Sequence, residues 1–315
     1  MTTPAPPRTA PPPAAAAALL EEIADLKRVR AAHLPGGASW ASDRFRAAWS
    51  ATLACGSVGE LDAVAVRFAA EAVAAARLGA ITRDQLRAAG LSEDAVTETF
   101  VRAVDEQAAA VEASLHTRLR SAIAEDAPGP DGETRWFVDA LARQPRAGAT
   151  CPGRSRYLLD PPENHAEHCF VVAVGGVLAS AAEGCPPGRP FLFGLAHHLH
   201  NATLADSGFA GEVLLGDRLD AVLDGLFERA YADLPDWIVS EVKTLREETL
   251  RADTPAARAF HTADVLDRVA EMRHFERAAA FAARTALHDL ELVHAGPTQA
   301  FGQQVLRDAG WWDET

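Results

Sequence analysis

The chain has 315 residues, 48% of them hydrophobic, and a formal net charge of −14. Folding at this length buries roughly three quarters of the surface that the unfolded chain exposes, so a substantial core needs no disulfide support. The negative charge argues against bulk DNA or RNA as a partner, because phosphate backbones are repelled. The four cysteines are widely spaced and form no CxxC pair, so we expect reduced thiols in a cytoplasmic protein.

The N-terminus carries no pattern of a folded element. Residues 1–13 are rich in proline and alanine and lack the apolar segment of a secretory signal, which predicts a disordered tail. The longest apolar run, residues 169–182, is too short to cross the roughly 30 Å hydrocarbon layer of a bilayer as a helix. We therefore expect no membrane segment.

Helical periodicity dominates the rest of the first half. Apolar side chains at helical spacing predict a helix over residues 14–32. Ser57–Glu60 and Thr82–Gln85 have the sequence of capping boxes, each opening a further helix. A long helix is predicted over residues 92–125, and the Pro- and Gly-rich loop that follows it, residues 126–132, is the candidate domain boundary.

The second half also has the spacing of helices, and strand signals are scarce. Gly208 and Gly211 are interpreted as a turn between two of them. The predicted helices cover residues 136–142, 164–182, 191–202, 216–231, 235–250, 255–273 and 275–294. The sequence thus predicts an all-α protein in four parts: a tail (1–13), an N-terminal helical bundle (14–125), a linker with one short helix (126–162) and a second helical domain (163–315).

Histidines are concentrated in this second domain. Five of the 11 histidines lie between His165 and His200, in two clusters, and a third cluster follows at His261–Asp264. Imidazole and carboxylate are the ligands of catalytic zinc, iron and manganese. Burying so many imidazoles without a partner would carry a large desolvation cost. We therefore predict a metal centre at which separate helices meet.

The spacing within each cluster indicates which side chains share a helix face. Residues three apart project together, as His165 and His168 do. On a continuous helix, His198 would point about 100° away from His197.

Three motifs carry a family resemblance. They read Glu163-Asn-His-Ala-Glu-His168 followed by Val172-Ala173, then Leu195-Ala-His197-His198-Leu-His-Asn201 with Asp206 beyond it, then Ala263-Asp264-Val-Leu. Their order and spacing resemble the HD superfamily of metal-dependent phosphohydrolases, and in particular its deoxynucleotidase-like branch. The resemblance covers roughly residues 144–294 and implies an HD-type helical domain.

The resemblance implies roles for individual residues. His168, His197 and Asp264 match the family's metal ligands, and Asp206 matches a later acid. Glu163 and Glu167 match the acids beside the first histidine. The expected cofactor is one divalent ion, namely zinc, manganese, iron or cobalt. The expected partner is a small phosphorylated substrate, with a nucleotide as one candidate.

Two departures from the family pattern alter these roles. His198 stands where the family has aspartate, so we expect it to be a fourth ligand of a mononuclear centre. Asn201 replaces a glutamate that helps to activate water, and an amide cannot act as a general base. Asp206 or Glu163 is then expected to handle protons at the catalytic site.

The remaining polar residues are assigned around this centre. Arg154 or Arg156 is expected to receive a substrate phosphate, since a guanidinium suits phosphate oxygens. Further imidazoles are expected to orient the ligands or to serve as alternative ligands: His165, His200 and His261. Besides hydrolysis, two alternatives stay open, an iron-dependent oxygenase on the same scaffold and a non-catalytic domain that senses a metal or small ligand.

Overall fold

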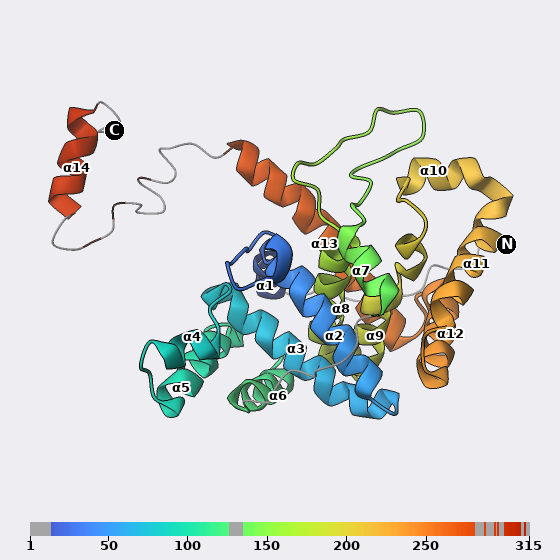
Figure 1. Ribbon diagram of the computed structural model, residues 1–315, viewed down its shortest axis with the longest axis horizontal. Helices are drawn as coiled ribbons and strands as arrows, with labels where there is room; N and C mark the ends of the chain where they lie inside the picture. Colours follow the sequence, from blue (N-terminus) through green and yellow to red (C-terminus); the bar gives the residue numbers. More distant parts are fainter. Residues whose placement is uncertain are drawn as a thin grey trace. The chain divides into compact units, whose positions relative to one another are not determined.

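The computed structural model describes residues 14–125 and 135–280, together with 287, 293, 295, 299–309 and 312 (Figure 1). Within these residues the regular elements are all helical, and β-pairing is limited to isolated bridges. The all-α prediction is therefore confirmed, while the predicted tail, residues 1–13, lies outside the described residues. The chain divides into two compact units, Met1–Ala270 and Glu271–Thr315. The second contains helix α14 (Gln299–Asp308).

The first helices begin where capping residues stand in the sequence. They are α1 (Ala14–Asp25), α2 (Trp40–Ala54), α3 (Val58–Leu78) and α4 (Arg83–Ala88), with a 3₁₀ turn, η1 (Pro35–Gly37), before α2. Ser57 caps α3 by accepting from the Glu60 amide, and Thr82 forms a reciprocal capping box with Gln85 at α4. Each cap satisfies amides that lack a partner inside the helix.

The single helix predicted over residues 92–125 is wrong. The structure has α5 (Glu93–Asp105), a 3₁₀ turn η2 (Ala108–Ala110) and α6 (Ala113–Ala124). Glu112 starts α6, because its carboxylate accepts from the Ser114 and Leu115 amides. Folding back lets both helices pack on α3. The alanines of η2 favour a helix intrinsically, so the sequence carried no sign of the break.

The second half follows the predicted helices with three differences. Its elements are α7 (Trp136–Arg143), α8 (His165–Glu183), α9 (Gly188–Ala196), η3 (Leu199–Ala202), α10 (Gly208–Leu215), η4 (Gly216–Arg218), α11 (Leu219–Tyr231), α12 (Asp236–Thr249) and α13 (Pro255–Ala280). Gly208 and Gly211 belong to a helix rather than a turn, although Gly208 begins it at a φ of +65°. The break predicted near residue 274 is absent, since α13 continues to Ala280.

The third difference is at the end of α9. The predicted helix 191–202 stops at Ala196, and His198 has φ −105° and ψ 19°, outside the helical region. The chain then continues as the 3₁₀ turn η3. Because the helix ends here, the 100° offset expected between His197 and His198 does not hold.

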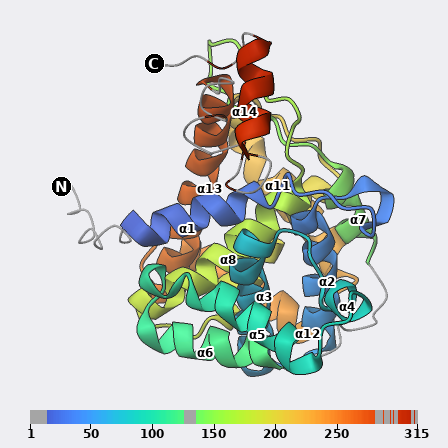
Figure 2. The ribbon, with the colours of Figure 1, turned by 90° about the vertical axis from the view of Figure 1, so that its left-hand side faces the viewer.

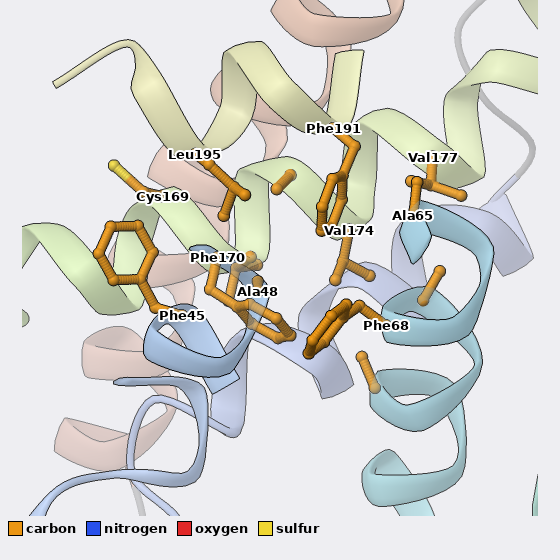
Figure 3. Close-up of a cluster of buried hydrophobic side chains, with 14 of the residues drawn as sticks. Phe45, Ala48, Ala65, Phe68, Cys169, Phe170, Val174, Val177, Phe191 and Leu195 are labelled. Carbon is orange, nitrogen blue, oxygen red and sulfur yellow. The ribbon is translucent and has the colours of Figure 1, made fainter. Parts of the chain in front are cut away.

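One buried core joins helices from both halves of the first unit. Phe45 of α2 and Phe68 of α3 lie with Phe170 of α8 and Phe191 of α9 in a single cluster (Figure 3). The Phe68 and Phe191 rings are stacked with centroids 6.0 Å apart, and α1 also packs on α3 and α8 (Figure 2). Residues on both sides of the predicted 126–162 linker therefore share this core.

Candidate metal centre

α8 delivers His168 into the interior. Asn164 caps this helix in a reciprocal capping box with Glu167, so the first turn is well fixed. His168 lies on that turn and its side chain is fully buried. Its Nδ1 is 2.7 Å from the Asp267 carboxylate. Its Nε2 is 3.2 Å from Nε2 of His197 and 3.4 Å from Oδ1 of Asp264.

The end of α9 contributes two more imidazoles to the same place. Nδ1 of His197 is 2.8 Å from the carbonyl oxygen of Gly194, one turn back. Nδ1 of His198 is 2.8 Å from Oδ1 of Asn201, whose amide nitrogen donates to the Leu204 carbonyl. The rings of His197 and His198 lie 4.3 Å apart, so the non-helical backbone at His198 brings both side chains to one point.

These partners determine which nitrogen of each ring carries its proton. Carbonyl and carboxylate oxygens only accept, so Nδ1 of His168 and of His197 must donate. The Asn201 amide nitrogen donates to the Leu204 carbonyl, so the Asn201 amide oxygen faces Nδ1 of His198. Nδ1 of His198 therefore donates as well. In the neutral rings, Nε2 of all three histidines therefore carries a free lone pair, as metal-ligating histidines do.

The separations match those of ligands that share one ion. Two ligands bound to one zinc at about 2.0–2.1 Å lie roughly 3.0–3.4 Å apart. Nε2 of His168 and Nε2 of His197 are at 3.2 Å, and one ligand atom from each of His168, His197 and His198 falls within 4.8 Å of the others. Two lone pairs facing each other at this distance repel, and only a cation between them, a proton or a metal ion, removes the repulsion.

Burial disfavours the charged forms of His197 and His198. Desolvation lowers the pKa of His197 to about 3, with the positive charge of His168 adding to the effect. Desolvation and the neighbouring His197 hold the pKa of His198 well below its usual range. Because protonation competes with coordination, a low pKa leaves these nitrogens available to a metal at neutral pH.

Asp264 adds a carboxylate from α13. Burial alone would raise the pKa of Asp264, but His168 and, more weakly, His197 and Arg268 lower it on balance. Its Oδ2 also accepts from Arg268 at 2.6 Å. Oδ1 of Asp264 thus remains ionised and free to coordinate a metal ion beside His168. The four ligands predicted from the sequence come from α8, from α13 and from the two residues that follow α9.

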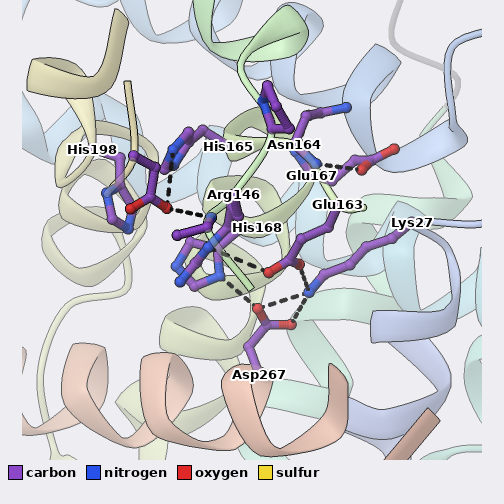
Figure 4. A network of polar contacts seen from close by, with 12 residues as sticks. Lys27, Arg146, Glu163, Asn164, His165, Glu167, His168, His198 and Asp267 are labelled. Atoms are coloured by element: carbon purple, nitrogen blue, oxygen red, sulfur yellow. Dashed lines mark hydrogen bonds and ion pairs between the residues drawn. The ribbon is translucent and has the colours of Figure 1, made fainter. Parts of the chain in front are cut away.

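A buried lysine lies on the other side of His168 (Figure 4). Nζ of Lys27 is 2.6 Å from Glu163 and 2.7 Å from Asp267, and the Lys27 side chain is 1% exposed. Nε of Arg146 is 3.4 Å from Glu163. Burial would raise the pKa of Glu163, but the charges of Lys27 and Arg146 lower it on balance. The predicted role of Glu163 as a proton carrier is disfavoured, because two cations hold it ionised.

Asp206 and His165 form a second polar pair beside the ligands. Oδ2 of Asp206 accepts from the Ala147 amide at 2.9 Å and lies 3.6 Å from Nε2 of His165. His165 is fully buried, and neither ring nitrogen makes a hydrogen bond with the described residues. Its ring lies 4.6 Å from that of His198. The pair therefore places a carboxylate and an imidazole next to a ligand.

The other predicted residues are not ligands in this arrangement, although the ring of His200 lies 5.5 Å from that of His198. Arg154 and Arg156 are exposed, and Arg156 donates to the Ser207 carbonyl. His261 makes its 2.7 Å hydrogen bond with the Thr249 carbonyl at the end of α12. His200 lies beside Phe227, with ring centroids 5.3 Å apart, and desolvation lowers its pKa to about 4. Asn201 orients His198 and does not act on protons.

Three residues of the site were missed. Asp267 follows Asp264 by three positions and so shares its helix face, a signal that was present in the sequence. Lys27 follows Ile23 by four positions and therefore falls on the apolar stripe of the first predicted helix. Arg146 lies in an irregular segment, where no periodicity indicates which way a side chain points. Its charge nevertheless acts on the imidazoles of His165, His197 and His198.

The chain matches no family model, and it is similar to no curated protein and to no solved structure. Among the described helices, α8 has the length and apolar composition to cross a bilayer, and most of it is buried inside the fold.

Proposed function

We propose that this protein is a metal-dependent hydrolase that acts on a small phosphorylated compound. The observation that carries the proposal is the convergence of three imidazoles, each with a ligand atom within 4.8 Å of the others. Their Nδ1 protons are held by oxygen acceptors, so their Nε2 lone pairs are free, and an ionised carboxylate lies 3.4 Å from Nε2 of His168. No neutral arrangement of hydrogen bonds satisfies facing lone pairs, whereas a divalent cation does.

His168, His197, His198 and Asp264 would hold one divalent ion. An ion in such a site supplies Lewis acidity toward water and toward phosphoryl oxygens. The side chains of His197, His198 and Asp264 are incompletely buried, so water and substrate can approach from their side. Three neutral ligands and one carboxylate leave most of the ion's positive charge available to an anionic substrate.

Hydrolysis also needs a group that accepts the proton of the attacking water and a group that binds the phosphate. Asp206, one of the two acids expected from the sequence, would accept the proton of the attacking water. The neighbouring His165 is poorly suited to this role, because burial and the charge of Arg146 hold its pKa far below its usual range. Arg146 would contact the phosphate, since its Nη1 is buried without a hydrogen-bond partner among the described residues. This assignment replaces Arg154 and Arg156 in the role expected from the sequence.

Phosphate release by the metal-loaded full-length protein tests the proposal. The protein is incubated with Zn²⁺, Mn²⁺, Fe²⁺ or Co²⁺ and then with a panel of nucleotides and sugar phosphates. We expect Arg146→Gln to lower kcat/KM roughly 10- to 100-fold through a lost charge-assisted contact. The matched variant Arg154→Gln, at an exposed arginine, should leave it within about twofold of wild type.

Other outcomes would select the alternatives. Bound iron with dioxygen consumption and no phosphate release would indicate an oxygenase, since histidine and carboxylate ligands also suit non-haem iron. Metal binding without turnover of any kind would favour a sensing role. A folded protein that binds none of the four metals would remove the basis of the proposal.

A further inference from the structure

Lys27 is the most deeply buried cation of the site, and it comes from a remote part of the chain. It follows α1 and reaches carboxylates 136 and 240 residues away in sequence. Its ammonium lies between Glu163 and Asp267, at 2.6 and 2.7 Å, as Figure 4 shows. Removing a lysine charge from water is costly unless close carboxylates compensate for it, and here two of them do.

The groups around this ammonium form a second set of metal-binding donors. One ligand atom from each of Glu163, His168 and Asp267 lies within 4.8 Å of the others. His168 lies between the two positions, because its Nε2 faces His197 while its Nδ1–H donates to Asp267. The carboxylates of Glu163 and Asp267 are therefore the donors that a cation at the second position would contact, and the Lys27 ammonium contacts both. In dinuclear hydrolytic sites two ions lie close together, and here one of the two positions is filled by Lys27.

We propose that the Lys27 ammonium occupies a second cation site and thereby restricts the centre to one metal ion. The inference rests on the proposed metal centre for the first ion. Lys27 is a positioning residue in this account: its charge keeps Asp267 ionised beside Nδ1 of His168. A lysine on a helix end can fill the site permanently, whereas a second metal would be exchangeable.

Metal stoichiometry tests this inference. Full-length protein is loaded with Mn²⁺, freed of excess metal, and measured by inductively coupled plasma mass spectrometry. We expect one ion per chain in wild type and two in Lys27→Ala, where the truncated side chain leaves room beside two carboxylates that have lost their shared cation. Lys27→Met, which keeps the length of the side chain without its charge, should block the space and bind one ion.

Further variants separate failure of this inference from failure of the metal centre. The double variant Lys27→Ala/His197→Ala should bind one ion, in the second site alone. One ion in wild type and one in a folded Lys27→Ala would overturn the inference and leave the first site intact. No ion in wild type would remove the proposed function, and Lys27→Ala would then have to bind one ion for the inference to stand.

Folding of Lys27→Ala provides an independent measurement. We expect Mn²⁺ to raise its thermal unfolding midpoint by several degrees more than that of wild type, because the second ion restores the lost charge compensation. If the variant is unfolded without metal, Mn²⁺ should restore the helical circular dichroism signal. Equal shifts in the two proteins, or no recovery, would contradict the inference.

Discussion

At the scale of single residues, the site depends on the hydrogen bond that Nδ1 of each imidazole donates. His168 donates to a carboxylate, His197 to a main-chain carbonyl and His198 to an amide. Such partners fix the orientation of the ring, and their loss typically lowers metal affinity 10- to 100-fold. The identity of these partners is not visible from motif spacing. Asn201, for example, stands in place of the family's water-activating glutamate and instead accepts a hydrogen bond from His198.

Asn201 offers the sharpest test at this scale. Asn201→Ala removes the acceptor of His198 and leaves Nδ1 and the Leu204 carbonyl unsatisfied, so we expect metal affinity to fall roughly 10- to 100-fold. The free energy of unfolding should also drop by about 1–3 kcal/mol. Asn201→Asp keeps an acceptor and should retain the affinity. Competition with a chelating dye measures the affinities, and equal affinity in Asn201→Ala and wild type would contradict the assigned role.

At the scale of elements, the position of His168 relative to His197 depends on how closely α8 and α9 pack. A Cβ at Gly194 would lie 2.4 Å from Cα of Ala173, so only glycine permits this approach. The same crossing places residue 197, at the end of α9, opposite residue 168. Helix packing and ligand geometry are thus set by one contact.

Gly194→Ala should therefore disturb both stability and metal binding. We expect a loss of about 1–3 kcal/mol in the free energy of unfolding, because the backbones must separate, and weaker metal binding. The matched control is Gly225→Ala in α11, where a Cβ would meet nothing within 4 Å. That change should stabilise the protein by about 0.5–1 kcal/mol. Urea unfolding measures both, and an unaffected Gly194→Ala would contradict the packing argument.

Predictability differed between kinds of element. Helices with capping residues and regular apolar spacing, such as α3 and α8, were predictable from the sequence alone. The breaks at η2 and after α9 were not, because alanine and histidine carry no local stop signal and tertiary packing decides where those helices end. Three of the four predicted ligands nevertheless have a ligand atom within 4.8 Å of one another, and Asp264 lies 3.4 Å from one of them, His168.

At the scale of the whole molecule, the larger of the two hydrophobic clusters in the first unit joins helices from both of its halves. Side chains from α2 and α3 are buried against α8 and α9, and Lys27 from the first segment completes the polar network around His168. The predicted division at 126–162 was based on a loop composition, which indicates a flexible connection but contains no information about which helix faces meet.

A fragment comprising residues 163–315 tests this dependence. We expect it to unfold without a cooperative transition and to bind a hydrophobic dye, because the faces of α8 and α9 that pack on α2 and α3 would be exposed. The full-length chain is the control and should unfold cooperatively. Circular dichroism during heating makes the comparison. A fragment that unfolds cooperatively and binds metal would show that the N-terminal helices are dispensable.

We expect the three Nε2 lone pairs and the Asp264 carboxylate to enclose one metal ion. Anomalous diffraction at the zinc absorption edge, from crystals of the zinc-loaded protein, locates such an ion. One strong peak is expected about 2.0–2.2 Å from Nε2 of His168, His197 and His198 and from Oδ1 of Asp264. A zinc-loaded crystal with no peak there, and with His168 and His197 still in direct contact, would contradict this expectation.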